Sequence, residues 1–156
     1  VVAERVRPAV FLLGSVVAGA SVGWLSERVG LRAATVFAGF VYAAGCILSA
    51  ASGDIAAFLT GRVIQGVAGG WISGFAYVAI ALLSPSGTSV ACRAITAIWG
   101  VATLVGPLLG GVFAQAGAWR GVFWFFAAQA VLFALAAGWL LRHASPAKAE
   151  AGVPWP

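Results

Sequence analysis

Five long stretches without a charged side chain constrain this chain of 156 residues more than any other feature. A bilayer core is about 30 Å thick, and an α-helix needs about 20 apolar residues to cross it. The uncharged apolar runs that reach this size are Pro8–Ser26, Ala33–Gly53, Val63–Cys92, Ala94–Trp119 and Gly121–Leu141. We therefore expect an all-α membrane protein.

The composition supports a membrane protein and excludes a nucleic-acid-binding one. The chain is 62% hydrophobic and 8% charged, whereas soluble domains average about 25% charged residues. A soluble fold of this length would have too little polar surface to cover itself. The net charge of +5 arises from single basic residues between apolar runs, and not from the clustered basic face that nucleic-acid binding requires.

Turn-forming residues set the boundaries of the predicted helices. The third run contains Ser84-Pro85-Ser86-Gly87, which should end a helix near Leu83, and this helix should begin near Ile55. The predicted membrane spans are residues 8–26, 33–52, 55–83, 94–114 and 121–141. Short connections between them predict an antiparallel bundle of five transmembrane helices within residues 1–143. The polar segment 144–156 reads as a loop or linker.

The distribution of basic residues predicts the orientation of the bundle, because cytoplasmic loops are enriched in Lys and Arg. One side holds Arg28, Arg32, Arg93, Arg142 and Lys148, and the other side holds Arg5, Arg7 and Arg120. This places the Glu27–Arg32 connection in the cytoplasm and the first residue outside. That topology and the absence of Met indicate that one further helix precedes the chain in a longer protein. We expect a multi-pass protein of a cell membrane, the bacterial inner membrane.

Small residues recur at the four-residue spacing that lets membrane helices approach closely. The matches are Gly19 and Gly23, then Gly66, Gly70 and Gly74, then Gly106 and Gly110. The triple stripe is the strongest of these predictions. Tryptophans near the ends of runs are expected to anchor the bundle at the interface, and these are Trp119, Trp124 and Trp139. Trp24, Trp71 and Trp99 could be anchors or could line a cavity, and packing is their favoured role.

No residue pattern indicates a metal centre, a cofactor or an enzyme. Cys46 and Cys92 are isolated, so packing is their expected role. His143 follows the last apolar run beside Arg142, which favours an interfacial position. An intramembrane enzyme would need a Ser/His, paired-Asp or metal cluster at membrane depth. Asp54 follows Ser52-Gly53 and is expected to cap the third predicted span, residues 55–83.

Five polar side chains within the apolar runs have two possible roles. They are Gln65, Tyr77, Thr96, Thr103 and Gln129. Each of them either faces a cavity or makes one hydrogen bond between helices. We favour the interhelical bond.

The connection Gly23-Trp-Leu-Ser-Glu-Arg-Val-Gly-Leu-Arg32 joins the first two predicted spans. Arg28 and Arg32 should hold it in the cytoplasm. Gly30 allows a tight turn with a positive φ. Glu27 can pair with a cation or lie at the N-terminus of a facing helix.

Arg62 is a charged residue within a predicted span, in the segment Leu59-Thr-Gly-Arg62-Val-Ile-Gln65-Gly66-Val-Ala-Gly69-Gly70. A charge at the centre of a membrane helix costs about 2.5–3.5 kcal/mol on insertion scales and is usually functional. The alternative is that Arg62 extends its side chain to the outer headgroups.

A third segment, Gly100-Val-Ala-Thr-Leu-Val-Gly106-Pro107-Leu-Leu-Gly110-Gly111, combines a proline with paired glycines. Pro107 removes a backbone hydrogen bond and should bend the helix. The flanking glycines should let the bend pack against a neighbour.

These three segments, in this order, resemble the signature set of the major facilitator superfamily. The resemblance covers helices two to six of the N-terminal half of a twelve- or fourteen-helix transporter of the drug/proton antiporter type. It implies a gating role for the connection, carried by Gly23, Leu25, Glu27, Arg28, Gly30 and Arg32, with Glu27 in place of the usual Asp. It implies proton coupling or gating for Arg62, Gln65 and Gly66. Gly106, Pro107, Gly110 and Gly111 then form the helix typical of exporters.

The function implied for the full-length protein is proton-coupled efflux of small lipophilic compounds or drugs. Its partners would be the lipid bilayer, the substrate, protons, the missing first helix and the missing C-terminal half. Two alternatives stay open. One is a metabolite or sugar carrier of the same superfamily, and the other is a truncated membrane module that does not transport.

Overall fold

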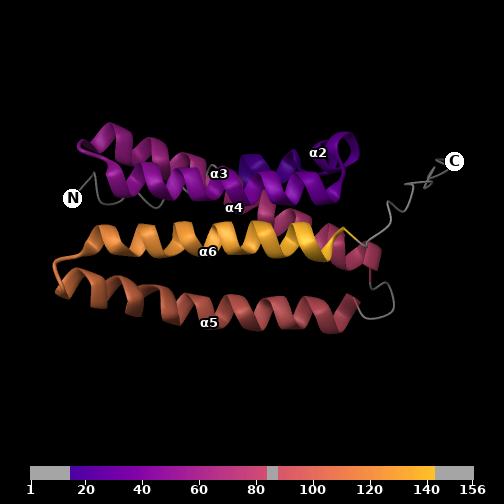
Figure 1. The fold of residues 1–156 in the computed structure, drawn as a ribbon. Helices are drawn as coiled ribbons and strands as arrows, with labels where there is room; N and C mark the ends of the chain where they lie inside the picture. The colour runs from indigo at the N-terminus through magenta and orange to yellow at the C-terminus, as the bar shows by residue number, and fades with distance from the viewer. Residues whose placement is uncertain (1–14, 84–87, 143–156) are drawn as a thin grey trace, which may run out of the picture.

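The computed structural model describes residues 15–83 and 88–142, and each regular element in these ranges is a helix (Figure 1). The helices are residues 15–20, α2 (Val22–Val29), α3 (Leu31–Ala51), α4 (Ile55–Leu83), α5 (Thr88–Gln115) and α6 (Trp119–Leu140). Four stretches are long and apolar enough to cross a membrane, namely Leu31–Ala51, Ile55–Ala81, Ser89–Gln115 and Trp119–Leu140. The all-helical membrane fold is confirmed, with four of the five predicted spans.

The first predicted span, residues 8–26, lies only partly within the described residues. Its described part is a helix at 15–20 that tightens at Ser21, whose backbone N–H bonds to the Ala18 carbonyl at 3.0 Å. The helix then continues as α2 through Glu27 and Arg28. Because Glu and Arg are good helix formers, charge ends the apolar run here without ending the helix. The predicted Glu27–Arg32 connection is therefore reduced to Gly30.

The helix α5 begins at Thr88, earlier than the predicted start at residue 94, so Arg93 lies inside it. A single Arg interrupts an apolar run but not a helix, because its long side chain can reach the headgroups. The bounds of α4, Ile55 and Leu83, are those predicted. The turn at 84–87, the linker 144–156 and His143 lie outside the described residues.

The central helix of the bundle is α3, which packs between α4 and α6 (Figure 1). Small residues form both seams. A Cβ added to Gly39 would lie 3.3 Å from Cα of Ala134 on α6, and one added to Gly61 on α4 would lie 2.8 Å from the carbonyl oxygen of Gly45. These glycines bring the helix backbones together. The sequence analysis did not single them out.

The Gly66–Gly70–Gly74 stripe of α4 packs against the helical residues 15–20 and against α2. The Ser15 hydroxyl donates to the Gly66 carbonyl at 2.9 Å, and a Cβ on Gly70 would lie 2.9 Å from Cα of Ser15. A Cβ on Gly74 would lie 3.0 Å from Cγ1 of Val22. The predicted close contact is confirmed for this stripe. For Gly19 and Gly23, no described residue lies within 4 Å of an added Cβ.

Many large apolar side chains face outward, and the core is built mainly of small ones, with Phe75 as a large exception. Leu104 is 77% exposed and Leu132 is 67% exposed, whereas Ala38 and Ala134 are fully buried. This arrangement suits a bundle surrounded by lipid, where close packing rather than apolar burial holds helices together. None of the α5 span is buried, and α5 runs alongside α6 on the side away from α3 (Figure 1). The three predicted tryptophan anchors are exposed, namely Trp119, Trp124 and Trp139.

Candidate functional site

A cavity of about 690 Å³ lies between the helix at 15–20 and helices α3 to α6. Its described lining is apolar or uncharged polar, and it is rich in aromatic and small residues: Ser15, Val16, Gly19, Tyr42, Gly69, Gly70, Ile72, Ser73, Gly74, Tyr77, Trp99, Phe126, Gln129, Ala130 and Phe133. Sites for drug-sized molecules occupy about 300–1,000 Å³ and combine an apolar lining with a few placed polar groups. This cavity has the size and chemistry of such a site.

Helical spacing explains how these side chains reach one cavity. On α6, Phe126, Gln129 and Phe133 follow the spacing that places residues on one helix face. On α4, Ser73 and Tyr77 do the same. Small residues of the lining, such as Gly70 and Ala130, leave space for the cavity between the aromatic rings.

A buried hydrogen-bond network lies next to the cavity and joins α3 to α4. The Gln65 side chain is 1% exposed, and its amide nitrogen donates to the Gly45 carbonyl at 3.0 Å and to the Ser49 hydroxyl at 2.9 Å. The Arg62 guanidinium donates to Oε1 of Gln65 at 2.7 Å. Gln65 therefore anchors the side chain of Arg62 to the α3–α4 seam. Tyr42 of α3 lines the cavity as well.

Arg62 lies about two turns into α4, and an aromatic cluster stands beside it. Its guanidinium carbon is 6.0 Å from the centroid of the Phe123 ring. Phe123 in turn stands edge to face with Phe58 at 5.6 Å and with Trp119 at 6.3 Å. The three rings thus form one cluster at the end of the bundle where α4 and α6 begin.

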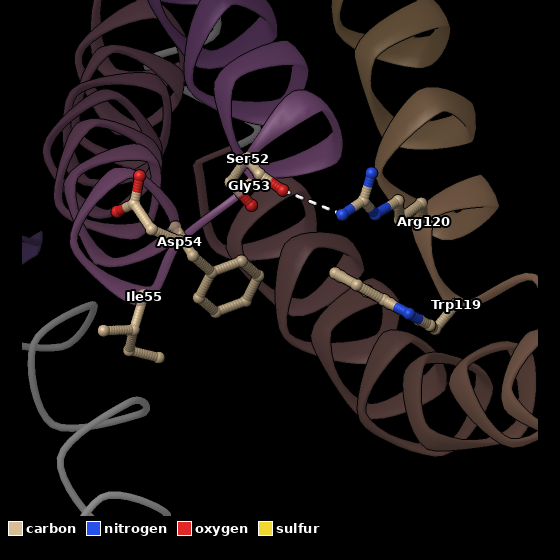
Figure 2. Close-up of a pocket in the computed structure, with 7 residues that line it drawn as sticks. Ser52, Gly53, Asp54, Ile55, Trp119 and Arg120 are labelled. Atoms are coloured by element: carbon tan, nitrogen blue, oxygen red, sulfur yellow. Dashed lines mark hydrogen bonds between the residues drawn. The ribbon is translucent and has the colours of Figure 1, made fainter.

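That end of the bundle holds a smaller pocket of about 340 Å³ (Figure 2). Arg120, at the start of α6, donates to the Ser52 carbonyl at 2.9 Å, and Asp54 lies on the other side of the pocket. Asp54 Oδ1 accepts a bond of 2.8 Å from the backbone N–H of Ala57, so the predicted N-cap is confirmed. Arg120 ties α6 to the α3–α4 turn, a role that the sequence analysis did not assign.

At the opposite end, the predicted gating residues surround the break between α2 and α3. Gly30 has a φ of +84°, the positive value that was predicted. Arg32 Nε donates to the Gly138 carbonyl on α6 at 3.0 Å. Arg28 lies over the Trp24 ring at 4.7 Å. Glu27 is exposed, and its side chain has no hydrogen bond or salt bridge with another described residue.

The other gating residues contribute packing. Leu25 packs against the buried cluster of Val22, Ala34, Ala38 and Phe75. An added Cβ on Gly23 would meet no described residue.

The glycines of α5 are not used for packing within the described residues. Pro107 lies inside the helix, but no described atom lies within 4 Å of a Cβ added to Gly106, Gly110 or Gly111. The expectation that these glycines pack against a neighbour is not met here. Within the described chain α5 has only α4 and α6 beside it, and its glycine face is turned to neither.

The five polar candidates divide into three groups. Gln65 makes bonds between helices, as favoured. Thr96 and Thr103 bond instead to carbonyls of their own helix, Cys92 at 3.0 Å and Trp99 at 2.8 Å, so the favoured interpretation was wrong for them. Tyr77 and Gln129 line the cavity.

Aromatic residues were the least well predicted. Trp71 packs as expected, since it contacts Phe37 at 6.2 Å and donates to the Ser21 hydroxyl at 2.8 Å. Trp99, however, lines the cavity, and Trp24 is exposed beneath Arg28. Buried Cys46 fits its expected packing role. The stripe Phe126, Gln129 and Phe133 was missed, although its one-face spacing with a central polar residue was visible in the sequence.

Comparison with known proteins identifies the family of this chain. Residues 8–155 match the family model of the Major Facilitator Superfamily. A probable multidrug-efflux transporter of Mycobacterium tuberculosis is 38% identical over 128 residues, which are 81% of this chain and 26% of the relative. The Acurin A biosynthesis cluster MFS-type transporter of Aspergillus aculeatus is 37% identical over 73% of this chain and 21% of its own length.

A more distant relative is a putative multidrug resistance protein of Yersinia enterocolitica, 28% identical over 78% of this chain and 26% of its own length. No solved structure matches the chain. The chain thus spans about a quarter of the length of these relatives. It belongs to the major facilitator superfamily, a family of multi-pass membrane transporters and not of enzymes.

Proposed function

We propose that the full-length protein exports small lipophilic molecules in exchange for protons, and that the 690 Å³ cavity is this segment's share of the substrate site. The lining of the cavity carries the proposal, because rings and small side chains with few polar groups suit a lipophilic substrate. The Mycobacterium and Yersinia relatives are named as a multidrug-efflux transporter and a multidrug resistance protein, which supports export as the function. The bacterial inner membrane is the proposed location.

Residues 1–143 are proposed to form part of the N-terminal six-helix half, with 144–156 opening the central linker. Transporters built from repeats bind substrate near the midplane between the halves. The missing first helix and the C-terminal half would complete the wall of the cavity. Glu27 and Asp54 are the only carboxylates in the described ranges, and neither lines the cavity. The proton-carrying group is therefore proposed to lie elsewhere in the protein.

The cytoplasmic connection is proposed as a gate, and its geometry suggests how. The Arg32 bond to the Gly138 carbonyl links the start of α3 to the end of α6. Gly30 changes the chain direction beside it. A movement of α2 would thus be transmitted through Gly30 and Arg32 to the C-terminal end of α6. The exporter-type glycines of α5 are proposed to face a helix of the C-terminal half.

The test is export of a neutral lipophilic dye, Nile red, by the full-length protein in a host that lacks its own efflux pumps. Cells that express the protein should clear the dye faster than cells with an empty vector, and an uncoupler that collapses the proton gradient should remove the difference. Dye clearance that continues after uncoupling would refute proton coupling. Transport of sugars but not of the dye would favour the carrier alternative.

A further inference from the structure

Several side chains of the cavity carry hydrogen-bonding groups that no other described residue satisfies. Three of them come from three different helices, namely Tyr42 on α3, Tyr77 on α4 and Gln129 on α6, and no hydrogen bond among the described residues involves their side chains. Other polar side chains nearby are satisfied, among them Gln65 and Trp71. The three unpartnered groups therefore converge on one space from three different helices.

An unsatisfied polar group at membrane depth is expensive. Burial of a hydroxyl or amide without a hydrogen bond costs roughly 2–7 kcal/mol, and hydrocarbon offers no water to satisfy it. Tyr42 and Gln129 lie near the middle of α3 and α6. Gln129 is exposed and Tyr42 is half-buried among the described residues, so their polar groups are open to the cavity and available to a molecule that enters it. A tyrosine hydroxyl both donates and accepts, and a glutamine amide does the same.

The remaining surface of the cavity defines the shape of the occupant. Trp99, Phe126 and Phe133 present rings from α5 and α6, and aromatic rings favour stacked or edge-to-face contact with another flat ring. The described lining has no charged residue, and an unpaired charge is costly to bury in such a site.

We infer that Tyr42, Tyr77 and Gln129 select substrates that are flat, aromatic and uncharged and that carry both a hydrogen-bond donor and an acceptor. This inference rests on the proposed function, since it treats the cavity as the substrate site. Tyr42, Tyr77 and Gln129 would then determine which lipophilic molecules bind, and the preferred class would be uncharged flat aromatic compounds.

The test measures binding to the purified full-length protein in lipid nanodiscs with three flat three-ring compounds. Acridone has an N–H donor and a C=O acceptor, N-methylacridone lacks the donor, and anthracene lacks both. Their dissociation constants are measured for the wild type, Gln129→Leu and Tyr77→Phe. Gln115→Leu is the matched control, because Gln115 is an exposed glutamine at the end of α5 that does not line the cavity. Lipid partitioning of each compound is the same for all variants and cancels in the comparison.

Gln129→Leu should weaken acridone binding about five- to tenfold, the factor that one neutral hydrogen bond contributes. The same variant should leave anthracene binding unchanged, and N-methylacridone should show a smaller loss. Tyr77→Phe should behave in the same way, and Gln115→Leu should change no dissociation constant. Equal effects on acridone and anthracene, or no effect on either, would overturn the inference and leave water as the partner of these groups.

A parallel Nile red export assay separates the two proposals. If acridone binding depends on Gln129 but no variant or wild type exports the dye, the proposed function fails and the binding site stands. If export is normal and acridone binding depends on neither Gln129 nor Tyr77, the export proposal stands and the specificity inference fails. Tighter binding of 9-aminoacridine, a cation at neutral pH, than of acridone would contradict the uncharged class.

Discussion

Arg62 donates a 2.7 Å hydrogen bond to Oε1 of Gln65, a residue one turn away on the same helix that is itself 1% exposed. The Gln65 amide nitrogen is held in turn by Gly45 and Ser49 of α3. The position of a charged side chain within the membrane is thus set by the contact of two helices. A hydrogen bond to a charged group contributes about 1.5–3 kcal/mol, so this network both joins α3 to α4 and orients Arg62.

Replacement of Gln65 by Leu should destabilise the protein by about 1–3 kcal/mol, the usual penalty for leaving buried polar partners unsatisfied. The partners affected are the Gly45 carbonyl, the Ser49 hydroxyl and the Arg62 guanidinium. The unfolding midpoint of the purified full-length protein in nanodiscs should fall. The exposed Gln115 supplies the control, since Gln115→Leu should leave the midpoint in place. An unchanged midpoint in Gln65→Leu would show that the network contributes nothing to stability.

Replacement of Arg62 by Ala should reduce proton-dependent export by the full-length protein to the background of an empty vector, while membrane insertion stays normal. The expectation follows from the usual functional role of an intramembrane charge. Arg62→Lys should retain part of the activity, because Lys keeps the charge but lacks the planar guanidinium. Dye efflux and the amount of protein in membranes are measured together. Full export by Arg62→Ala would exclude a coupling role.

Replacement of Gly61 by Ala should destabilise the α3–α4 seam by about 1–3 kcal/mol, as overpacking of a close contact does. A methyl group there would lie 2.8 Å from the Gly45 carbonyl oxygen and would collide with the Ser49 hydroxyl. Gly100 is the matched helical control, because an added Cβ meets no described atom and Ala favours a helix by up to about 1 kcal/mol over Gly. The two variants should therefore move the unfolding midpoint in opposite directions. Equal unfolding midpoints for the Gly61 and Gly100 variants would show that the close contact at Gly61 does not limit stability.

Replacement of Gly110 by Leu should abolish export without lowering the amount of protein in the membrane. No described atom lies within 4 Å of a Cβ at this position, so the described part of the chain accommodates the larger side chain. The loss would arise at the proposed contact between α5 and the C-terminal half. Efflux rate per inserted protein is the measurement, with Leu108→Ala on exposed Leu108 as a control for an altered lipid-facing position. Normal export by Gly110→Leu would argue against that contact.

Local patterns predicted what depends on a few neighbouring residues. Asp54 caps α4 and Gly30 takes a positive φ, because capping and backbone freedom are properties of a residue and its immediate sequence. The Gly66–Gly70–Gly74 stripe was also found, since its four-residue spacing marks one helix face. Thr96 and Thr103 were misjudged, because a hydroxyl can bond to its own helix as readily as to another.

The amino-acid sequence was sufficient to establish the helical membrane fold and the family. Apolar length sets which segments can cross a bilayer, and this quantity is additive along the chain. The cavity, the two seams of Gly39 and of Gly45 with Gly61, and the convergence of Tyr42, Tyr77 and Gln129 emerged only from the packed structure. Each of these depends on how helices rotate and cross, and that is decided by contacts between residues far apart in the chain. The same apolar runs packed in another rotation would bury different polar groups and enclose a different space.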